Sequence, residues 1–249
     1  MTKVRGVRIL AAPCCGARYA FPWYVSMNFS AWEYWTDGWR DGHLMPHDSG
    51  LRLCTCGRCV LVKELMEVET AASSDLPGMD HVPAELLPEC IADAGTEDLE
   101  TVARLEYWRV LNHPYRDRYR RHRDAEEAAT KAAWEAANPD RRTWWDKLRG
   151  RKPPCYLRPA GSPLTYPTFE ATDEQRRNME RLSELLCARG AASRHGYTLE
   201  RAELYREQGR FDEAERVIRA IDERSVGVTS KLITELIKEK QSAPVRYRM

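Results

Sequence analysis

Two clusters of cysteine near the N-terminus constrain the fold of this chain more than any other feature. Five of the eight cysteines belong to them: Cys14 and Cys15 before Gly16, then Cys54 and Cys56 before Gly57, with Cys59 just beyond. Paired cysteine clusters of this kind are typical of a zinc site to which each cluster contributes thiolates. The glycine after each cluster lets the backbone turn its amides toward sulfur. The pattern therefore predicts a zinc-ribbon-like β domain over residues 1–70.

The cysteine spacing leaves the ligand set open. The favoured set is Cys14, Cys15, Cys54 and Cys56, because its two halves resemble each other. Cys59 is the alternative ligand, since it has the standard spacing from Cys56. Adjacent cysteines chelate one ion awkwardly, so three cysteines with His43 or His47 form a third arrangement, and free reduced thiols are the alternative to a metal. Core packing is expected for the three isolated cysteines, Cys90, Cys155 and Cys187.

Composition favours a soluble globular protein: 31% of the 249 residues are charged and 43% are hydrophobic. The apolar run Ile9–Ala12 is too short for a signal peptide, and no run is long enough for a transmembrane helix. We therefore expect a cytoplasmic location and no membrane partner. In that compartment, clustered cysteines indicate metal ligands rather than disulfides.

The order of local patterns predicts an α+β chain, with a small β domain followed by an all-helical C-terminal region. A strand is expected over residues 4–10 and a closing strand over 60–62, with nine aromatic residues in the insert 19–39. Thr96 is a predicted N-cap for a helix over 97–112, and Thr172 with Gln175 predicts a capping box for a helix over 173–189. Further helices are expected over 115–137, 195–208, 211–222 and 229–240.

These elements suggest five parts. The zinc-ribbon-like domain is followed by an acidic connector over 71–96, a basic helical hairpin over 97–150, a proline-rich segment over 151–171 and a helical domain over 172–249. Residues 104–152 carry 14 basic and 8 acidic side chains, whereas residues 1–103 carry 8 basic and 15 acidic ones. The central part is therefore the basic one.

A helical hairpin with the features of a tetratricopeptide repeat is predicted within the last part. Small and aromatic residues stand where that repeat has its close contacts, and a glycine stands at its turn: Ala202, Tyr205, Gly209, Phe211, Ala214 and Ile218. A single unit cannot bury both of its faces, so the flanking helices would act as neighbours. An ordinary helical bundle is the alternative.

Three stretches together resemble a group of poorly characterised bacterial proteins that join an N-terminal cysteine domain to tetratricopeptide-like helices. They are residues 12–19, residues 34–57 with Tyr34-Trp35-Thr36-Asp37-Gly38 and Cys54-Thr55-Cys56-Gly57, and residues 202–214. The resemblance implies this architecture and a zinc site. It implies no activity and no catalytic residues.

Three classes of function were weighed. A non-catalytic interaction or adaptor protein with a structural zinc site is favoured, and its partner would be an unidentified protein bound at Arg201, Tyr205, Arg206 and Arg210. The alternative is a nucleic-acid-binding protein that uses the Tyr/Arg-rich helix, with contacts from Arg116, Arg118, Arg120, Arg121 and Arg123. A hydrolase built from His43, His47 and nearby carboxylates (Glu33, Asp37, Asp41 and Asp48) matches no catalytic spacing, so no enzyme is expected.

Overall fold

A computed structural model describes residues 3–27, 31–42, 48–157, 165–190, 197–221 and 227–247. The chain divides into two compact units. Unit 1 combines residues 1–112 with residues 170–249, and unit 2 is residues 113–169. The first segment of unit 1 ends between two helices, α2 (Glu97–Leu111) and α3 (His113–Ala137). It does not end at either limit of the acidic connector predicted over 71–96. The N-terminal β region and the C-terminal helices therefore belong to the same unit.

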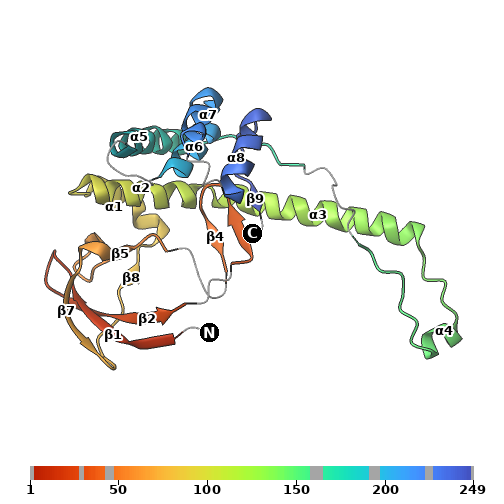
Figure 1. Ribbon diagram of the computed structural model, residues 1–249, viewed down its shortest axis with the longest axis horizontal. Helices are drawn as coiled ribbons and strands as arrows, with labels where there is room; N and C mark the ends of the chain where they lie inside the picture. The colour runs from red at the N-terminus through yellow and green to blue at the C-terminus, as the bar shows by residue number, and fades with distance from the viewer. Residues whose placement is uncertain are drawn as a thin grey trace. The chain divides into compact units, whose positions relative to one another are not determined.

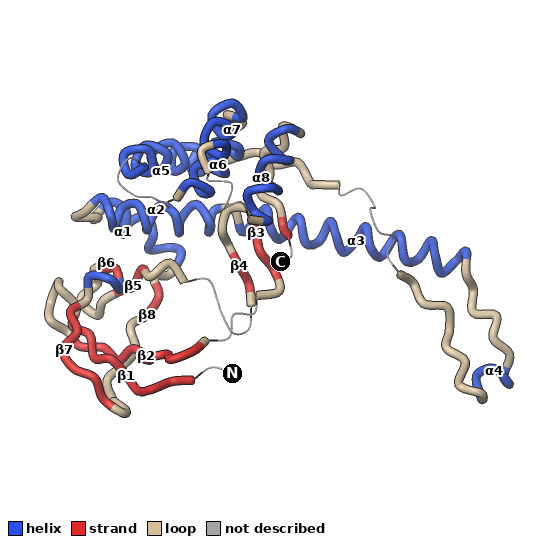
Figure 2. Tube along the Cα trace, in the orientation of Figure 1, coloured by secondary structure: helices blue, strands red, loops and turns tan. Residues whose placement is uncertain are grey.

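Three small antiparallel sheets form the β part of unit 1 (Figures 1 and 2). In the first, β1 (Lys3–Ala11) pairs with β2 (Arg18–Ser26) and β7 (Met66–Ala71). In the second, β5 (Leu51–Leu53) pairs with β6 (Cys59–Leu61) and β8 (Asp80–His81). In the third, β3 (Glu33–Trp35) pairs with β4 (Arg40–Asp41) and with β9 (Arg246–Tyr247) near the C-terminus. The predicted strands over 4–10 and 60–62 are present.

A close approach of two strands explains one residue of β1. A Cβ atom on Gly6 would lie 2.4 Å from the carbonyl oxygen of Ala71 in β7. Only glycine leaves room for that oxygen, so this position of β1 accepts no side chain without a backbone shift.

The helices of unit 1 begin and end close to the predicted residues. Thr96 caps α2 through the amide of Leu99, and Thr172 and Gln175 form the predicted capping box of α5 (Asp173–Gly190). Then follow α6 (Thr198–Glu207), α7 (Phe211–Arg219) and α8 (Val228–Lys238). The acidic connector 71–96 contains β8, a 3-10 turn at Ala84–Leu86 and α1 (Leu87–Ala92). Within the described residues no helix is both long and apolar enough to cross a membrane.

The α6–α7 hairpin packs as its sequence predicted. Ala202 and Ala214 are fully buried in one cluster with Tyr205 and Ile218, and Phe211 packs against it. Gly209 has a φ of +74°, which the tight turn between the helices requires. Figure 1 shows α5, α6 and α7 stacked side by side. The α+β class is therefore confirmed, while the tetratricopeptide-like character of the hairpin stays a prediction.

Unit 2 consists of α3, the one-turn helix α4 (Trp144–Leu148) and a return segment that runs back along α3. Aromatic side chains hold the return segment in place: Tyr156 packs on Trp134, Tyr166 on Tyr119 and Phe169 on Tyr115. The order of these contacts is antiparallel, because later residues meet earlier parts of α3. The described stretches 151–157 and 165–169 of the proline-rich segment thus pack on α3 through these aromatic residues.

Candidate metal centre

Two turns of unit 1 bring the cysteine clusters together. The first turn joins β1 to β2 and is closed by hydrogen bonds of Ala12 with Gly16 and Ala17, with Gly16 at a φ of +73°. The second joins β5 to β6 and is closed by hydrogen bonds of Cys54 with Gly57 and Arg58, with Gly57 at a φ of +84°. A residue with a side chain rarely adopts such angles, so both glycines are needed for the turns. The two turns thus have matching construction, as their sequences suggested.

Four sulfur atoms meet where the turns face each other. All Sγ atoms of Cys14, Cys15, Cys54 and Cys56, the cysteine cluster, lie within 4.8 Å of one another. The Sγ distances are 3.4 Å for Cys14 to Cys56, 3.4 Å for Cys15 to Cys54 and 3.9 Å for the adjacent pair Cys14 and Cys15. Tetrahedral zinc with sulfur ligands at about 2.3 Å needs edges of about 3.8 Å. The cluster therefore fits one metal ion, and the adjacent cysteines pose no geometric obstacle.

Tyr19 supports the cluster from the side. Its buried hydroxyl group lies 3.3 Å from the Sγ atom of Cys54 and accepts a hydrogen bond of 2.9 Å from the backbone amide of Thr55. Such an outer contact fixes the orientation of a metal-binding sulfur. Sequence reasoning counted Tyr19 only among the aromatic residues of the insert. Tyr19 lies three residues after Gly16, on the strand that leaves the first turn. This short distance from the turn could have predicted that its side chain lies near the cluster.

The thiols differ in acidity. Burial, with hydrogen bonds among the neighbouring thiols, raises the pKa of Cys14 to about 12. Burial also opposes ionisation of Cys54. Hydrogen bonds outweigh this effect and lower the pKa of Cys54 to about 6; they come from the backbone amide of Cys56, the Tyr19 hydroxyl group and the neighbouring thiols. A backbone hydrogen bond involving Ala17 lowers the pKa of Cys15. The contact of Cys15 with Cys54 and burial raise that pKa by more, so it lies above its usual value. Cys54 therefore ionises before Cys14 and Cys15.

Cys59 does not belong to the cluster, which corrects its role as the alternative ligand. It forms a disulfide with Cys90 in α1, 31 residues away in sequence. Cys90 is buried as predicted, but as a bonded partner rather than as a packing thiol, whereas Cys155 and Cys187, for which core packing was also predicted, are exposed. Cys59 opens β6, and its side chain packs with the apolar cluster around α1. Sequence spacing could not reveal this, because Cys90 lies alone in the connector.

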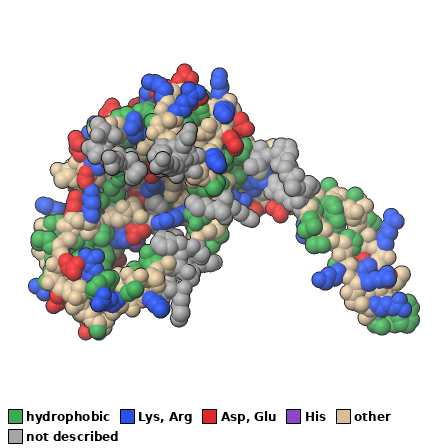
Figure 3. Space-filling model, in the orientation of Figure 1, with side chains coloured by type: hydrophobic (Ala, Val, Ile, Leu, Met, Phe, Trp, Pro, Cys, Tyr) green, Lys and Arg blue, Asp and Glu red, His purple; other side chains and the backbone are tan. Residues whose placement is uncertain are grey.

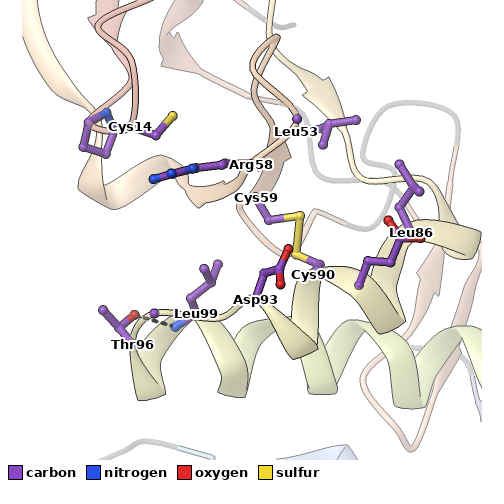
Figure 4. A pocket seen from close by; sticks show the side chains of 13 residues that line it. Cys14, Leu53, Arg58, Cys59, Leu86, Cys90, Asp93, Thr96 and Leu99 are labelled. Carbon is purple, nitrogen blue, oxygen red and sulfur yellow. Dashed lines mark hydrogen bonds between the residues drawn. A yellow bond between two sulfur atoms is a disulfide. The ribbon is translucent and has the colours of Figure 1, made fainter.

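A pocket of about 660 Å³ adjoins the cysteine cluster. Cys14 lines it together with Arg58 and both cysteines of the disulfide (Figure 4). Cys15 and Cys56 are exposed and Cys54 is buried. Solvent therefore reaches one side of the cluster, while the opposite side lies on the core formed by Ala12, Tyr19, Val60 and Met79.

The carboxylates considered for catalysis have structural partners. Glu33 accepts a hydrogen bond of 2.9 Å from the Trp35 indole, and Asp48 forms an ion pair of 2.8 Å with Arg52, whose hydrogen bond lowers the pKa of Asp48 to about 2. Asp37 accepts hydrogen bonds from Trp39 and Asn112. His43 and His47 lie outside the described residues. Within the described residues, the cysteine cluster is the only group of three or more metal-ligating side chains.

A buried polar network that sequence reasoning missed joins four elements of unit 1. Asn112 at the end of α2 donates hydrogen bonds to Asp37 in the β3–β4 turn (3.0 Å) and to Glu207 in α6 (3.2 Å). The Trp108 indole donates to Glu207 at 2.8 Å, and Gln175 in α5 donates to Asn112 at 3.1 Å. Burial, with the nearby Glu203 and Asp37 carboxylates, raises the pKa of Glu207 well above its usual value.

The residues predicted to bind a protein partner are not all at the surface. Arg206 has no exposed side-chain surface: it pairs with Glu203 and donates to the carbonyl groups of Gln241 and Ala243. Tyr205 is also buried, and Arg201 is half-buried. Arg210 is exposed, pairs with Glu213 and stacks over the Tyr205 ring. Arg206 is therefore a core residue, which corrects its predicted place on a docking surface.

The predicted nucleic-acid contacts on α3 divide in a similar way. Arg116 and Arg123 are buried, and Arg123 pairs with Glu126. Arg118 and Arg121 are exposed, and Arg120 forms an ion pair of 3.0 Å with Asp117. The interleaved tyrosines, Tyr115 and Tyr119, face the return segment of unit 2 and are buried, so they offer no stacking surface for bases.

Comparison with known proteins yields no relative. A scan against protein-family models gave no match, and searches of curated proteins and of solved structures also gave none. The resemblance to bacterial cysteine-domain proteins therefore stays a prediction.

Proposed function

We propose that this chain is a non-catalytic interaction protein whose β region is held by a structural zinc ion. The observation that carries the proposal is the cysteine cluster, in which four thiol groups surround one point. Four thiolates complete the tetrahedral coordination of zinc and leave no open position for water or substrate, which distinguishes structural from catalytic zinc sites. Sulfur ligands in this geometry also select zinc over harder cations such as magnesium. The proposal places the chain in the cytoplasm and requires the four cluster thiols to be reduced, although Cys59 and Cys90 of the same chain are joined by a disulfide.

Metal content tests the zinc site. Protein purified without added metal should contain one zinc ion per chain by elemental analysis, and Cys54→Ser should lose it. Cys155→Ser is the matched control, because Cys155 is an exposed free cysteine outside the cluster. Chelation should lower the melting temperature of the wild-type chain, since zinc binding energy in small domains is folding energy. Metal-free protein that melts identically would contradict a structural role.

The interaction surface is proposed on the exposed part of the α6–α7 hairpin, around Arg210 and the half-buried Arg201. Co-purification from the native host should recover a partner with the wild-type chain and lose it with Arg210→Glu. Arg219→Glu is the control, because Arg219 is also an exposed arginine of α7 that pairs with a glutamate on the same helix. If both variants recover the partner equally well, Arg210 is not part of the interaction surface.

Nucleic-acid binding is the alternative to this function, with Arg118, Arg120 and Arg121 as its remaining contacts on α3. Phosphate recognition makes affinity fall steeply as salt is added. Binding of a duplex or single strand that is insensitive to salt would count against it.

A further inference from the structure

The tip of unit 2 is a small folded element rather than a loose loop. We define it as residues 140–152, which contain α4. Thr143 and Asp146 form a reciprocal capping box at the start of α4. Arg142 pairs with Asp140 at 2.8 Å and donates to the carbonyl group of Arg151, while Arg151 pairs with Asp146 at 2.9 Å. These contacts tie the incoming and outgoing arms together beneath the helix.

The tip presents large apolar side chains to solvent. Trp144, Trp145 and Leu148 are 63%, 60% and 66% exposed. Exposed indoles are unusual because they are large apolar groups that normally lie inside a fold or against a partner. Their positions, two adjacent and one a turn later, place them together on one short helix. The space-filling view shows hydrophobic side chains gathered at this end, next to basic ones (Figure 3).

Unpaired cations surround these apolar groups. The tip contains six basic and two acidic residues. Both acidic residues, Asp140 and Asp146, pair with arginines of the tip itself. The other four basic side chains are exposed and form no ion pair within the described part of the chain: Arg141, Lys147, Arg149 and Lys152. The tip therefore offers contacts that complement a partner that is both negatively charged and apolar.

We propose that the tip binds the surface of an anionic lipid bilayer, with Trp144, Trp145 and Leu148 in the interfacial layer and the four cations on lipid headgroups. Tryptophan prefers the membrane interface, and lysine and arginine beside it are attracted to anionic lipids. Such binding needs no transmembrane helix, so it revises the expectation of no membrane partner, which rested on the absence of a long apolar run. It goes beyond the proposed interaction function and does not depend on the metal.

The geometry favours a bilayer over single-stranded nucleic acid. The Trp144 and Trp145 rings meet edge to face, with centroids 4.4 Å apart and planes at 69°. One ring thus covers part of the face of the other. A nucleic-acid base would need that face free in order to stack on it. Leu148 is aliphatic and offers bases no stacking surface, whereas lipid chains accept it readily.

Vesicle co-sedimentation of the full chain tests the proposal. Wild-type protein should bind phosphatidylcholine vesicles that contain ~30% phosphatidylserine and should bind pure phosphatidylcholine vesicles far more weakly. Trp144→Ser with Trp145→Ser should weaken binding at least ~10-fold, and Lys147→Gln with Arg149→Gln should weaken it by roughly 30-fold. Trp32→Ser is the matched control, because Trp32 is an exposed tryptophan of unit 1, and it should leave binding unchanged.

Three results would overturn the proposal: no binding to either vesicle, equal binding to both, or equal loss with Trp32→Ser. Tight binding to a single-stranded oligonucleotide that requires Trp144 and Trp145, without vesicle binding, would assign the tip to nucleic acid instead. Unchanged zinc content and circular dichroism spectra of the tip variants would show that any loss is local.

Discussion

Glu207 illustrates how single residues of this chain depend on surroundings far away in sequence. It is buried in α6, and its carboxyl group accepts hydrogen bonds from Trp108 in α2 and from Asn112 at the end of α2. Burial is the main cause of its raised pKa, with repulsion from Glu203 and Asp37 adding to it. A protonated Glu207 is therefore favoured in the native state more than in the unfolded chain.

The pH dependence of stability should report this proton. The native pKa of Glu207 lies above 4.5, the usual pKa of a glutamate. Its contribution to the free energy of unfolding is therefore fully present below pH 4.5 and is lost as the pH rises from 4.5 toward the native pKa. Glu207→Gln keeps the shape and removes the titration. We expect the variant to gain about 1 kcal/mol or more over the wild type between pH 5 and pH 8.

Urea unfolding at both pH values measures this difference. Glu213→Gln serves as control, since Glu213 is a less buried glutamate on α7 that pairs with Arg210. A difference between Glu207→Gln and the wild type that stays constant with pH would show that Glu207 is ionised throughout.

Zinc affinity should rise with pH. Zinc binds thiolates, so it must displace the protons that Cys14 and Cys15 retain because their pKa values are raised, whereas Cys54 has already ionised above about pH 6. The protons of Cys14 and Cys15 alone imply a gain of at least ~100-fold in affinity per pH unit near neutrality. Competition with a chelator of known affinity at two pH values measures the slope. A slope near zero would mean that the thiols do not bind the ion.

At the scale of elements, Arg206 holds α6 to the C-terminal segment that leads to β9. Its guanidinium group pairs with Glu203, donates to the carbonyl groups of Gln241 and Ala243, and lies 3.5 Å from Thr36 Oγ1. Thr36 in turn accepts a hydrogen bond from the amide of Val245. One side chain thus connects a helix, the end of β3 and the chain before β9.

Removal of this side chain should destabilise unit 1 strongly. Arg206→Ala leaves Glu203 buried without its partner, which costs about 3–5 kcal/mol of unfolding free energy. Arg210→Ala, on the exposed side of the same hairpin, should change stability by less than ~1 kcal/mol. Chemical denaturation compares the two variants, and if Arg206→Ala fails to fold, Arg206→Lys should still show a clear loss. Equal stability of the Arg206 and Arg210 variants would contradict the structural role.

The Cys59–Cys90 disulfide connects β6 to α1, with a sequence separation of 31 residues. Closing a loop of that length restricts the unfolded chain and should stabilise the protein by about 3–4 kcal/mol. Cys90→Ser should lower the melting temperature under oxidising conditions and have a smaller effect in the presence of a phosphine reductant. Cys155→Ser is the control. A non-reduced peptide map that lacks the linked peptides would rule the bond out.

At the scale of the whole molecule, units 1 and 2 have different constructions. Unit 1 has several buried clusters, and one of them joins its two sequence segments by packing Leu105 and Trp108 with Met179 and Leu204. The tip of unit 2 is instead held by ion pairs and caps of its own. Replacement of residues 139–154 by a short Gly-Ser linker should therefore leave zinc content unchanged and shift the main melting transition by less than ~3 °C. Loss of zinc or of the transition would show that unit 1 requires the tip.

Several features of this protein were determined by the sequence alone, because they depend on neighbouring residues. Thr96 and Thr172 predicted helix starts through capping, Gly209 predicted the α6–α7 turn, and the two Cys-Gly clusters predicted which four sulfur atoms meet. The capping and turn signals lie within a few residues of the structures that they specify, whereas the two cysteine clusters, 38 residues apart, were paired by their matching chemistry. The strands β1 and β6 and the main helices were predictable for the same reason.

Only the tertiary structure decided which polar residues are buried and which cysteine pairs with Cys59. Arg206 and Arg116 look like surface residues in a charged helix, but they are buried, and Arg206 reaches carbonyl groups more than thirty residues away. Trp35 is buried whereas Trp32 is exposed, and hydrogen bonds of Asn112 with Asp37 and Glu207 join the β3–β4 turn to α2 and α6. The physical reason is that burial and long-range hydrogen bonds depend on packing between distant segments, which a local pattern does not encode.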